Sequence, residues 1–143
     1  MVHLHGVLYW DEYRFEVEFE SYVAEYMAKF VRERSDRERI WIVEYNGEVL
    51  GCIAVVKNTD EEAWLRWFLL HPRIRGKGIG KRLLDEALAF ARSAGYSSIY
   101  LLTVSTLEAA ARLYLKAGFE VTEERPERSW GQELVHQRYD LAL

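Results

Sequence analysis

A short glycine-rich segment between two apolar runs most constrains what this chain can fold into. Residues 75–83 read Arg-Gly-Lys-Gly-Ile-Gly-Lys-Arg-Leu. They follow a strand-like run at Trp64–Leu70 and lead into residues 79–92, whose apolar side chains recur at helical spacing. Glycine lets a backbone approach a ligand closely, and a helix start presents unpaired N–H groups. The segment therefore predicts a pyrophosphate site, supported by the cations Arg75, Lys77, Lys81 and Arg82.

Two common phosphate-binding loops do not match this segment. A Walker A loop requires a hydroxyl residue after its Gly-Lys pair, and Arg82 follows Gly80 and Lys81 here. A Rossmann fingerprint requires the spacing G-x-G-x-x-G, whereas Gly76, Gly78 and Gly80 are evenly spaced. An unrelated α/β domain that binds ATP or NAD is therefore only a third interpretation of the loop.

The pattern that fits resembles the GNAT N-acetyltransferase superfamily, whose signature R/Q-x-x-G-x-G/A opens a helix. Arg75–Gly80 carries that signature, and Ala110–Phe119 carries the second block of the family, A-x-x-L-Y-x-K-x-G-F. Scattered matches at both ends, over His5–Tyr13 and Trp130–Gln137, resemble bacterial GNAT domains that also occur fused to MarR-type transcription regulators.

Length and composition indicate one domain and a cytoplasmic location. The 143 residues correspond to a single N-acetyltransferase domain over residues 1–143, and no apolar stretch approaches the ~18 residues of a membrane span. The first residues lack the pattern of a secretory signal, and one cysteine fits a reducing compartment. A net charge of −4 argues against nucleic-acid binding, and the four histidines lack the spacing of metal ligands.

Periodicity and turn residues predict a mixed order of helices and strands. The strand before the glycine loop, the following helix and the next strand should form a right-handed parallel crossover. The resemblance implies an α/β fold, with a GNAT-like central mixed, splayed sheet of about six or seven strands and helices on both faces. The predicted helices are 15–31, 79–92 and 106–116, the predicted strands are 7–10, 40–44, 49–56, 64–70, 98–104, 119–122 and 133–141, and 126–131 is a predicted loop.

The resemblance also implies where a cofactor binds. In GNAT folds, the pantetheine arm of coenzyme A lies where two parallel strands splay apart. By this resemblance, backbone groups of Leu69, Leu70 and His71 would bind that arm as an added strand would. The pyrophosphate of acetyl-CoA would lie on the amides of Arg75, Gly76, Lys77, Gly78, Ile79, Gly80 and Lys81. A 3′-phosphate would contact Lys77, Lys81 or Arg82.

The activity that the resemblance implies is direct transfer of an acetyl group from acetyl-CoA to a primary amine in a ternary complex. The departing thiolate needs a proton. Tyr114 occupies the tyrosine position of the family, and a phenol with a pKa near 10 can protonate a thiolate whose thiol pKa is near 8.5. The spacing of apolar residues around Tyr114 fits a core aromatic equally, so both interpretations stay open.

The general base is not fixed by the sequence. Many GNAT relatives have a glutamate in the middle of the strand before the glycine loop, but Arg66 and Trp67 stand there. The candidates are Glu12, Glu61 and Glu62, and transfer through water or from an amine that is already neutral is equally allowed. Because the strand glutamate is missing, the alternative function is a non-catalytic acyl-CoA-binding sensor or partner module.

The acceptor is also left open. A small-molecule amine, an antibiotic, a peptide N-terminus and a lysine side chain all fit the resemblance, and a homodimer through the last strands is expected by analogy. The residues expected to line an acceptor pocket are Trp10, Tyr13, Trp67 and Trp130.

Two further residues have structural interpretations. Leu107 stands where the family often has an asparagine, so Ser105 or Thr106 is predicted to cap the following helix. Cys52 lies in an apolar strand run and is predicted to be a core residue.

Overall fold

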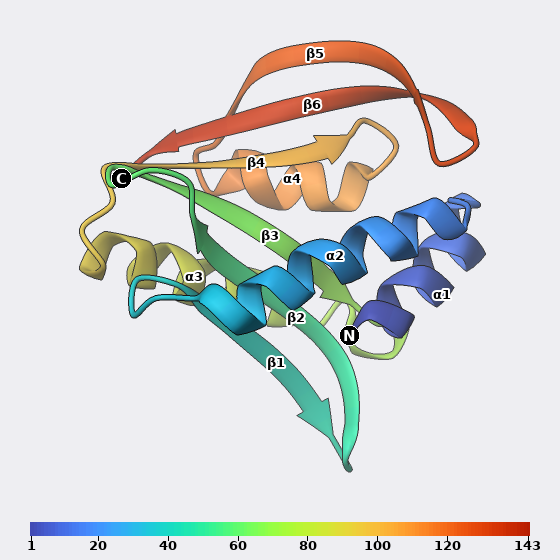
Figure 1. Cartoon of the computed structure of the whole chain (residues 1–143), viewed down its shortest axis with the longest axis horizontal. Coiled ribbons are helices and arrows are strands. Elements are labelled where there is room, and N and C mark those ends of the chain that lie inside the picture. The colour runs from blue at the N-terminus through green and yellow to red at the C-terminus, as the bar shows by residue number, and fades with distance from the viewer.

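The computed structural model, which describes residues 1–143, has a six-stranded sheet at its centre and helices on either side (Figure 1). In chain order the elements are α1 (Val2–Tyr13), α2 (Val17–Glu33), β1 (Arg39–Tyr45), β2 (Glu48–Lys57), β3 (Glu62–Leu70), a 3-10 turn at Pro72–Ile74, α3 (Ile79–Ser93), β4 (Ser98–Val104), α4 (Glu108–Lys116), β5 (Glu120–Ser129) and β6 (Gln132–Ala142).

The strand order confirms the predicted mixed sheet. It runs β1-β2-β3-β4-β6-β5, and every neighbouring pair is antiparallel except β3 and β4. The parallel pair is joined through α3, as the crossover rule predicts. The sheet has the six strands and the two helical layers expected from the α/β interpretation.

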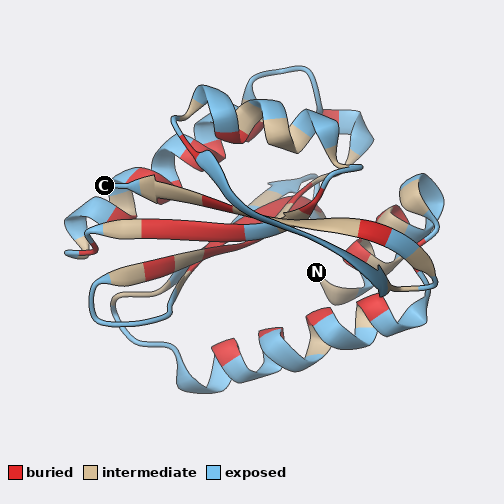
Figure 2. Cartoon of the chain, turned by 90° about the horizontal axis from the view of Figure 1, so that it is seen from above, coloured by how far each residue is buried: buried red, intermediate tan, exposed pale blue.

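Each face of the sheet has its own hydrophobic core, because the helices present apolar stripes at helical spacing. On one face, α2 buries Phe19, Val23, Met27 and Phe30 against the sheet together with α1. On the other face, α3 and α4 bury their own stripes against Ile53, Leu65, Ile99 and neighbouring strand residues. Figure 2 shows the buried segments of the sheet lying between these two layers.

An extra residue in β3 changes which face its side chains occupy. Ala54 pairs with Arg66 and Cys52 pairs with Leu69, so three steps along β3 oppose two along β2. At this β-bulge, Trp67 adopts a φ of +50°. Leu65 packs in the core of α3 and α4, whereas Leu69 packs in the core of α1 and α2. The bulge therefore redirects the end of the strand.

The parallel strands also separate at this point. β3 pairs with β4 only from Glu62 to Trp64, opposite Ser98 to Tyr100. Beyond Trp64, the residues of β3 that pair do so with β2 alone, and Trp67 and Phe68 at the bulge have no pairing partner. This confirms the predicted splay, and it leaves a gap between the carboxyl ends of the two parallel strands.

The predicted strand at residues 7–10 is wrong, because α1 covers the whole segment. His5 and Leu8 are buried at a helical step of three residues, while Val7 and Trp10 are 39% and 50% exposed. The ring of Tyr9 lies 4.4 Å from that of Phe19 on α2. Pairing with α2, rather than with the sheet, decides the conformation of this apolar run.

The predicted loop at residues 126–131 is also wrong. β5 continues to Ser129, and only Trp130 and Gly131 form the turn into β6. Pro126 pairs with Val135 in this antiparallel hairpin. An edge strand tolerates a proline, since the missing N–H can face away from the ladder, and β5 is the edge of the sheet.

The predicted cap of α4 is wrong as well. Leu107 occupies the N-cap position, and no side chain makes a capping hydrogen bond there. Neither Ser105 nor Thr106 takes that role. In addition, none of the helices has both the length and the apolar composition needed to cross a membrane.

Candidate functional site

Two adjoining cavities occupy the region where β3 leaves β4. Their volumes are about 320 Å³ and about 340 Å³, and the first opens onto the glycine loop. The second is lined by residues of the splayed strands, of α1 and α2, and of the β5–β6 hairpin. Both are lined by Tyr9, Phe68, Leu107 and Ala110, so the two cavities are neighbours that share part of their walls.

The glycine loop has the backbone that the sequence predicts for an anion site. Gly76 and Gly78 adopt φ values of +71° and +77°, and a Cβ added at either would meet no heavy atom within 4 Å. Gly78 is the N-cap of α3, and no side chain caps that helix. The first amides of α3 therefore have no side-chain acceptor, which is the arrangement that binds anions at helix starts.

Gly80 is required for a different reason. A Cβ at this position would lie 3.0 Å from a Leu70 methyl carbon and 3.2 Å from one of Leu113. The absence of a side chain lets the start of α3 approach the end of β3 closely.

Arg75 is already bound to two other parts of the structure. Its Nη atoms donate to both carboxylate oxygens of Glu12 on α1, each at 2.6 Å, and its Nε donates to the Leu70 carbonyl at 2.8 Å. The Glu12 carboxylate raises the pKa of Arg75 above its ordinary value. The guanidinium ties α1 and the end of β3 to the loop.

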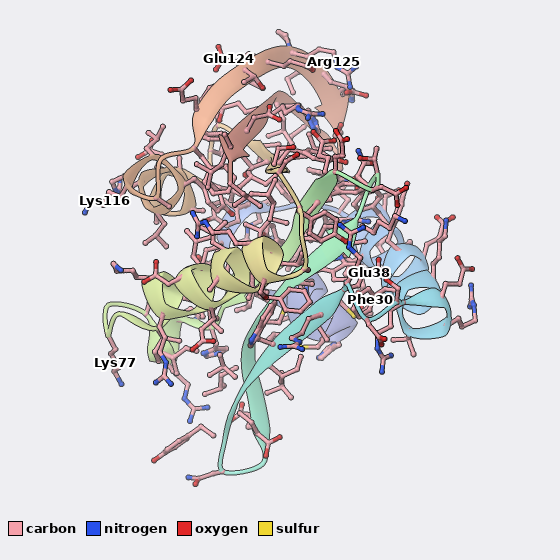
Figure 3. The ribbon with its side chains drawn as sticks, turned by 90° about the vertical axis from the view of Figure 1, so that its left-hand side faces the viewer. Phe30, Glu38, Lys77, Lys116, Glu124 and Arg125 are labelled. Carbon is pink, nitrogen blue, oxygen red and sulfur yellow. The ribbon has the colours of Figure 1, made fainter.

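The other cations of the loop differ in whether they already form an ion pair within the protein. Lys81 forms an ion pair with Asp85 one helical turn later, at 2.5 Å. Lys77 makes no ion pair, is exposed, and points away from the body of the molecule in Figure 3. Arg82 is also exposed and unpaired. Lys77 and Arg82 are therefore the cations available to an anionic ligand without breaking an existing pair.

The predicted pantetheine residues divide into two groups. Leu69 and Leu70 line the first cavity. The N–H of His71 instead donates to the Leu50 carbonyl across the sheet, at 2.7 Å, and His71 lines neither cavity. The structure places the pyrophosphate candidates Arg75, Gly76, Gly78, Gly80 and Lys81 on the wall of the first cavity, and Lys77 and Ile79 off it.

Tyr114 lies on the wall of the second cavity. Its ring centroid is 6.0 Å from that of Phe68, 5.9 Å from that of Phe119 and 5.7 Å from that of Tyr139. The residue is 6% exposed, and burial raises the pKa of the phenol above its ordinary value. Tyr114 is thus both a core aromatic and a protonated hydroxyl at the gap.

The candidate bases are poorly placed. Both oxygens of Glu12 are held by Arg75, although Glu12 does line the first cavity. Glu62 bonds Arg138 and Asn58 at the far end of β3, and neither Glu61 nor Glu62 lines a cavity. The structure brings none of the three carboxylates beside Tyr114.

The aromatic residues expected at an acceptor pocket fall in three places. Trp67 and Trp130 line the second cavity, and Tyr13 lines the first. Trp10 is half exposed and lines neither.

Sequence reasoning missed four wall residues of the second cavity, of which Glu127 and Ser129 fall in the segment that it placed in a loop. The β5–β6 hairpin contributes Arg125, Glu127, Ser129 and His136. Residues 120–129 do not alternate between apolar and polar side chains, because nearly all of them are exposed, so their sequence does not indicate a strand.

Arg66 is the other wall residue whose place was not predicted. It is 8% exposed, and its guanidinium carbon lies 3.9 Å from the ring centroid of Trp64 and 4.2 Å from that of Tyr26. Its only hydrogen bond runs from Nη2 to the Tyr22 hydroxyl, at 3.2 Å. Burial lowers the pKa of Arg66 below its ordinary value.

Cys52 is a core residue, as predicted. It is fully buried, and its Sγ donates to the Trp67 carbonyl at 2.8 Å. Burial raises the pKa of the thiol to about 12, which keeps it protonated and unreactive. No three histidine, cysteine or acidic side chains gather as a metal-binding group.

Known proteins resemble this chain in both sequence and fold. The Escherichia coli protein named "Uncharacterized N-acetyltransferase YjgM" is 40% identical over 83 residues, which are 56% of this chain and 50% of that protein. An uncharacterized N-acetyltransferase of Schizosaccharomyces pombe is 30% identical over 118 residues, which are 80% of this chain and 72% of that protein. The chain spans about half of YjgM and less of several other relatives.

A solved structure supports the same grouping. The yncA acetyltransferase of Salmonella typhimurium, whose structure contains its cofactor acetyl-CoA, is 25% identical and superposes with a TM-score of 0.67 over 88% of this chain and 74% of that chain. The sequence profile of the Acetyltransferase (GNAT) family matches residues 6–119, which include most of α1, the splayed strands and the glycine loop. The chain therefore belongs to the acetyltransferase (GNAT) family.

Proposed function

We propose that this protein is an acetyl-CoA-dependent N-acetyltransferase that transfers the acetyl group to a primary amine within a ternary complex. The observation that carries the proposal is the pair of adjoining cavities, one bordered by the uncapped start of α3 and the other by the Tyr114 side chain. A long ligand with a phosphate at one end and a reactive group at the other requires neighbouring binding surfaces of these two kinds.

The loop residues fit the phosphate end of acetyl-CoA. The open positions at Gly76 and Gly78 allow close approach, and the uncapped amides of α3 can donate to the pyrophosphate. Lys77 and Arg82 are free to contact a further phosphate. Leu69 and Leu70 would border the pantetheine arm, whereas both backbone groups of His71 already have protein partners, its N–H on the Leu50 carbonyl and its carbonyl accepting from the Ile74 N–H.

Acetyl-CoA supplies an activated thioester when bound, and Tyr114 supplies a proton. As the amine nitrogen forms its bond to the acetyl carbon, the carbon–sulfur bond breaks and the phenol of Tyr114 donates its proton to the departing sulfur. The surplus proton of the amine passes to solvent, from which the phenolate is reprotonated. Since Glu12, Glu61 and Glu62 are paired or distant, the amine enters the reaction already neutral or loses its proton to water.

Finer expectations from the sequence belong to this proposal as well. The end segments that resemble the bacterial domains found fused to MarR-type regulators meet in space, since the side-chain amide of Gln132 donates to the Tyr13 carbonyl at 2.5 Å. We also propose a cytoplasmic location and a homodimer formed through the last strands, where β5 leaves a free sheet edge.

Calorimetric titration with acetyl-CoA tests the cofactor assignment, with ATP and NAD as controls. Selective binding of acetyl-CoA supports the proposal. Absence of binding, or preference for ATP or NAD, overturns it.

Release of free thiol from acetyl-CoA with a panel of primary amines then tests catalysis. Release that depends on the amine supports an enzyme. Binding of acetyl-CoA without release for any amine supports the non-catalytic acyl-CoA-binding module instead.

A further inference from the structure

Arg66 is a buried cation that has no acidic partner. Its side chain lines the second cavity, and the residue is only 8% exposed. Of the acceptors in the protein, only the Tyr22 hydroxyl bonds one of its five N–H donors. Buried charges in proteins are normally paired, because removing an ion from water is costly. An unpaired buried guanidinium at a cavity wall therefore indicates a site whose anion comes from a ligand.

Arg138, a second arginine in the same group of stacked side chains, differs from Arg66 in being paired with carboxylates. The rings of Trp64 and Tyr100 are stacked, with their centroids 5.4 Å apart. The guanidinium of Arg66 lies over the Trp64 ring, and that of Arg138 lies over the Tyr100 ring with its central carbon 4.1 Å from the centroid. Arg138 donates to Asp140 at 2.7 Å and to Glu62 at 3.0 Å. Of these two cations in one stack, only the one that lines the cavity has no carboxylate.

Apart from the bond of Nη2 to the Tyr22 hydroxyl, the N–H donors of the Arg66 guanidinium have no acceptor in the protein. The ring centroids of Trp64 and Tyr26 lie 3.9 and 4.2 Å from its central carbon. Contacts of this kind hold the charge through the aromatic faces and do not use the in-plane N–H donors. Two parallel in-plane donors match the two oxygens of a planar carboxylate.

The remaining charges of the cavity do not compete for this position. Glu127 is the only acidic residue on the wall, and it is paired with Arg125 at 2.8 Å. The Nε1 of Trp67, another wall residue, is a buried donor without any acceptor. Apolar and aromatic side chains form most of the rest of the wall.

We propose that the amine acceptor of this enzyme carries a carboxylate, which Arg66 binds, and an apolar or aromatic side chain, as in a free amino acid. This inference rests on the proposed function, since it identifies the substrate class of the same site. A single guanidinium suits a monoanion, and a cation at the wall disfavours acceptors whose only charge is an ammonium.

Matched acceptors test the inference in the wild-type protein. L-Phenylalanine, L-phenylalaninamide and 2-phenylethylamine share the ring and the amine but differ in the carboxylate, and L-leucine with 3-methylbutylamine gives an aliphatic pair. Thiol release from acetyl-CoA should show kcat/KM about 10- to 100-fold higher for each amino acid than for its carboxylate-free counterpart, as expected for a charge-assisted hydrogen-bond pair. Equal values, or faster turnover of the amines, overturn the inference.

Substitution then assigns the discrimination to Arg66. Arg66→Gln should bring the ratio of kcat/KM for L-phenylalanine to kcat/KM for 2-phenylethylamine close to one, and Arg66→Lys should keep part of the preference for the carboxylate. Arg138→Gln is the matched control, because it removes the paired cation of the same stack, and it should retain the full preference. A preference that persists in Arg66→Gln refutes the role of Arg66, even when the wild type discriminates.

A binding measurement separates failure of this inference from failure of the proposed function. With acetyl-CoA bound, thermal unfolding is followed with L-phenylalanine and with 2-phenylethylamine. If no amine releases thiol but L-phenylalanine alone raises Tm, catalysis is wrong and the carboxylate site stands. If neither compound raises Tm and none is acetylated, the carboxylate site is wrong.

Discussion

Both carboxylate oxygens of Glu12 accept hydrogen bonds of 2.6 Å from Arg75, so helix α1 is joined to the first residue of the glycine loop. The two side chains are 25% and 41% exposed, respectively. The pair thus neutralises a cation that the sequence assigned to pyrophosphate binding, and it occupies a carboxylate that the sequence offered as a general base.

Glu12→Gln should therefore bind acetyl-CoA more tightly while losing little stability. The substitution releases the charge of Arg75 toward the phosphates, whereas a partly exposed ion pair contributes only about 1 kcal/mol or less to the free energy of unfolding. Calorimetry at low and high salt checks the gain in affinity, which salt should diminish. Loss of a general base would instead lower kcat by about 100-fold or more, and such a loss would contradict our placement of Glu12.

Tyr114→Phe should lower kcat by about 100-fold and leave the Kd for acetyl-CoA nearly unchanged, since a general acid acts mainly in the transition state. Tyr139→Phe is the control, because it removes a neighbouring hydroxyl that bonds Gln137 rather than lining a cavity. Burial raises the pKa of Tyr114, so its phenol should not ionise below the ordinary tyrosine value near 10. Stability lost without any change in turnover would assign Tyr114 to the core alone.

The parts of the fold that sequence reasoning recovered are those with strong local signals. The Asn46-Gly47 hairpin has the positive φ values, +51° and +78°, that favour these two residues. The glycine loop could likewise be placed before α3 from residue type alone.

The predictions failed at segments whose conformation is decided by tertiary contacts rather than by local sequence. Residues 7–10 have an apolar run that fits a strand or a helix, and packing of Tyr9 on Phe19 selects the helix. β5 carries no alternating pattern, because it is an exposed edge strand. Arg66 could not be identified from local pattern, since its unpaired state depends on α2, on β3 and on the bulge at Trp67.

His5 should make the protein less stable as the pH falls from 7 toward 4. Burial lowers the pKa of His5 from 6.5 to about 4, against the opposing bond to the Met1 carbonyl. Between these values the unfolded chain binds the proton and the folded chain does not, so the stabilisation is complete above pH 6.5 and is lost as the pH falls toward 4. This group should remove about 2 kcal/mol of stability between pH 7 and pH 5.

Urea unfolding of His5→Gln and His3→Gln at both pH values checks this expectation. His3 lies exposed on the same helix and serves as the control. The His5 variant should lose most of the difference between pH 7 and pH 5, and the His3 variant should keep it. An unchanged difference in His5→Gln would mean that another group titrates.

Gly78 and Gly47 form a matched pair for testing the phosphate site. Their φ values are +77° and +78°, and a Cβ added at either position would meet no heavy atom within 4 Å. Gly78 precedes α3 at the first cavity, whereas Gly47 lies in the β1–β2 turn and lines neither cavity. An aspartate at either glycine therefore brings the same backbone strain and the same charge.

Gly78→Asp and Gly47→Asp should each lower the free energy of unfolding by about 1 kcal/mol, the cost of a left-handed conformation for a residue with a Cβ. Only Gly78→Asp should abolish acetyl-CoA binding, because its carboxylate stands where the amides of α3 would receive the pyrophosphate. Calorimetry and urea unfolding on both variants separate the two effects. Unchanged affinity in a folded Gly78→Asp protein would refute the phosphate site, and equal loss of affinity in both variants would attribute the effect to strain and not to charge at the loop.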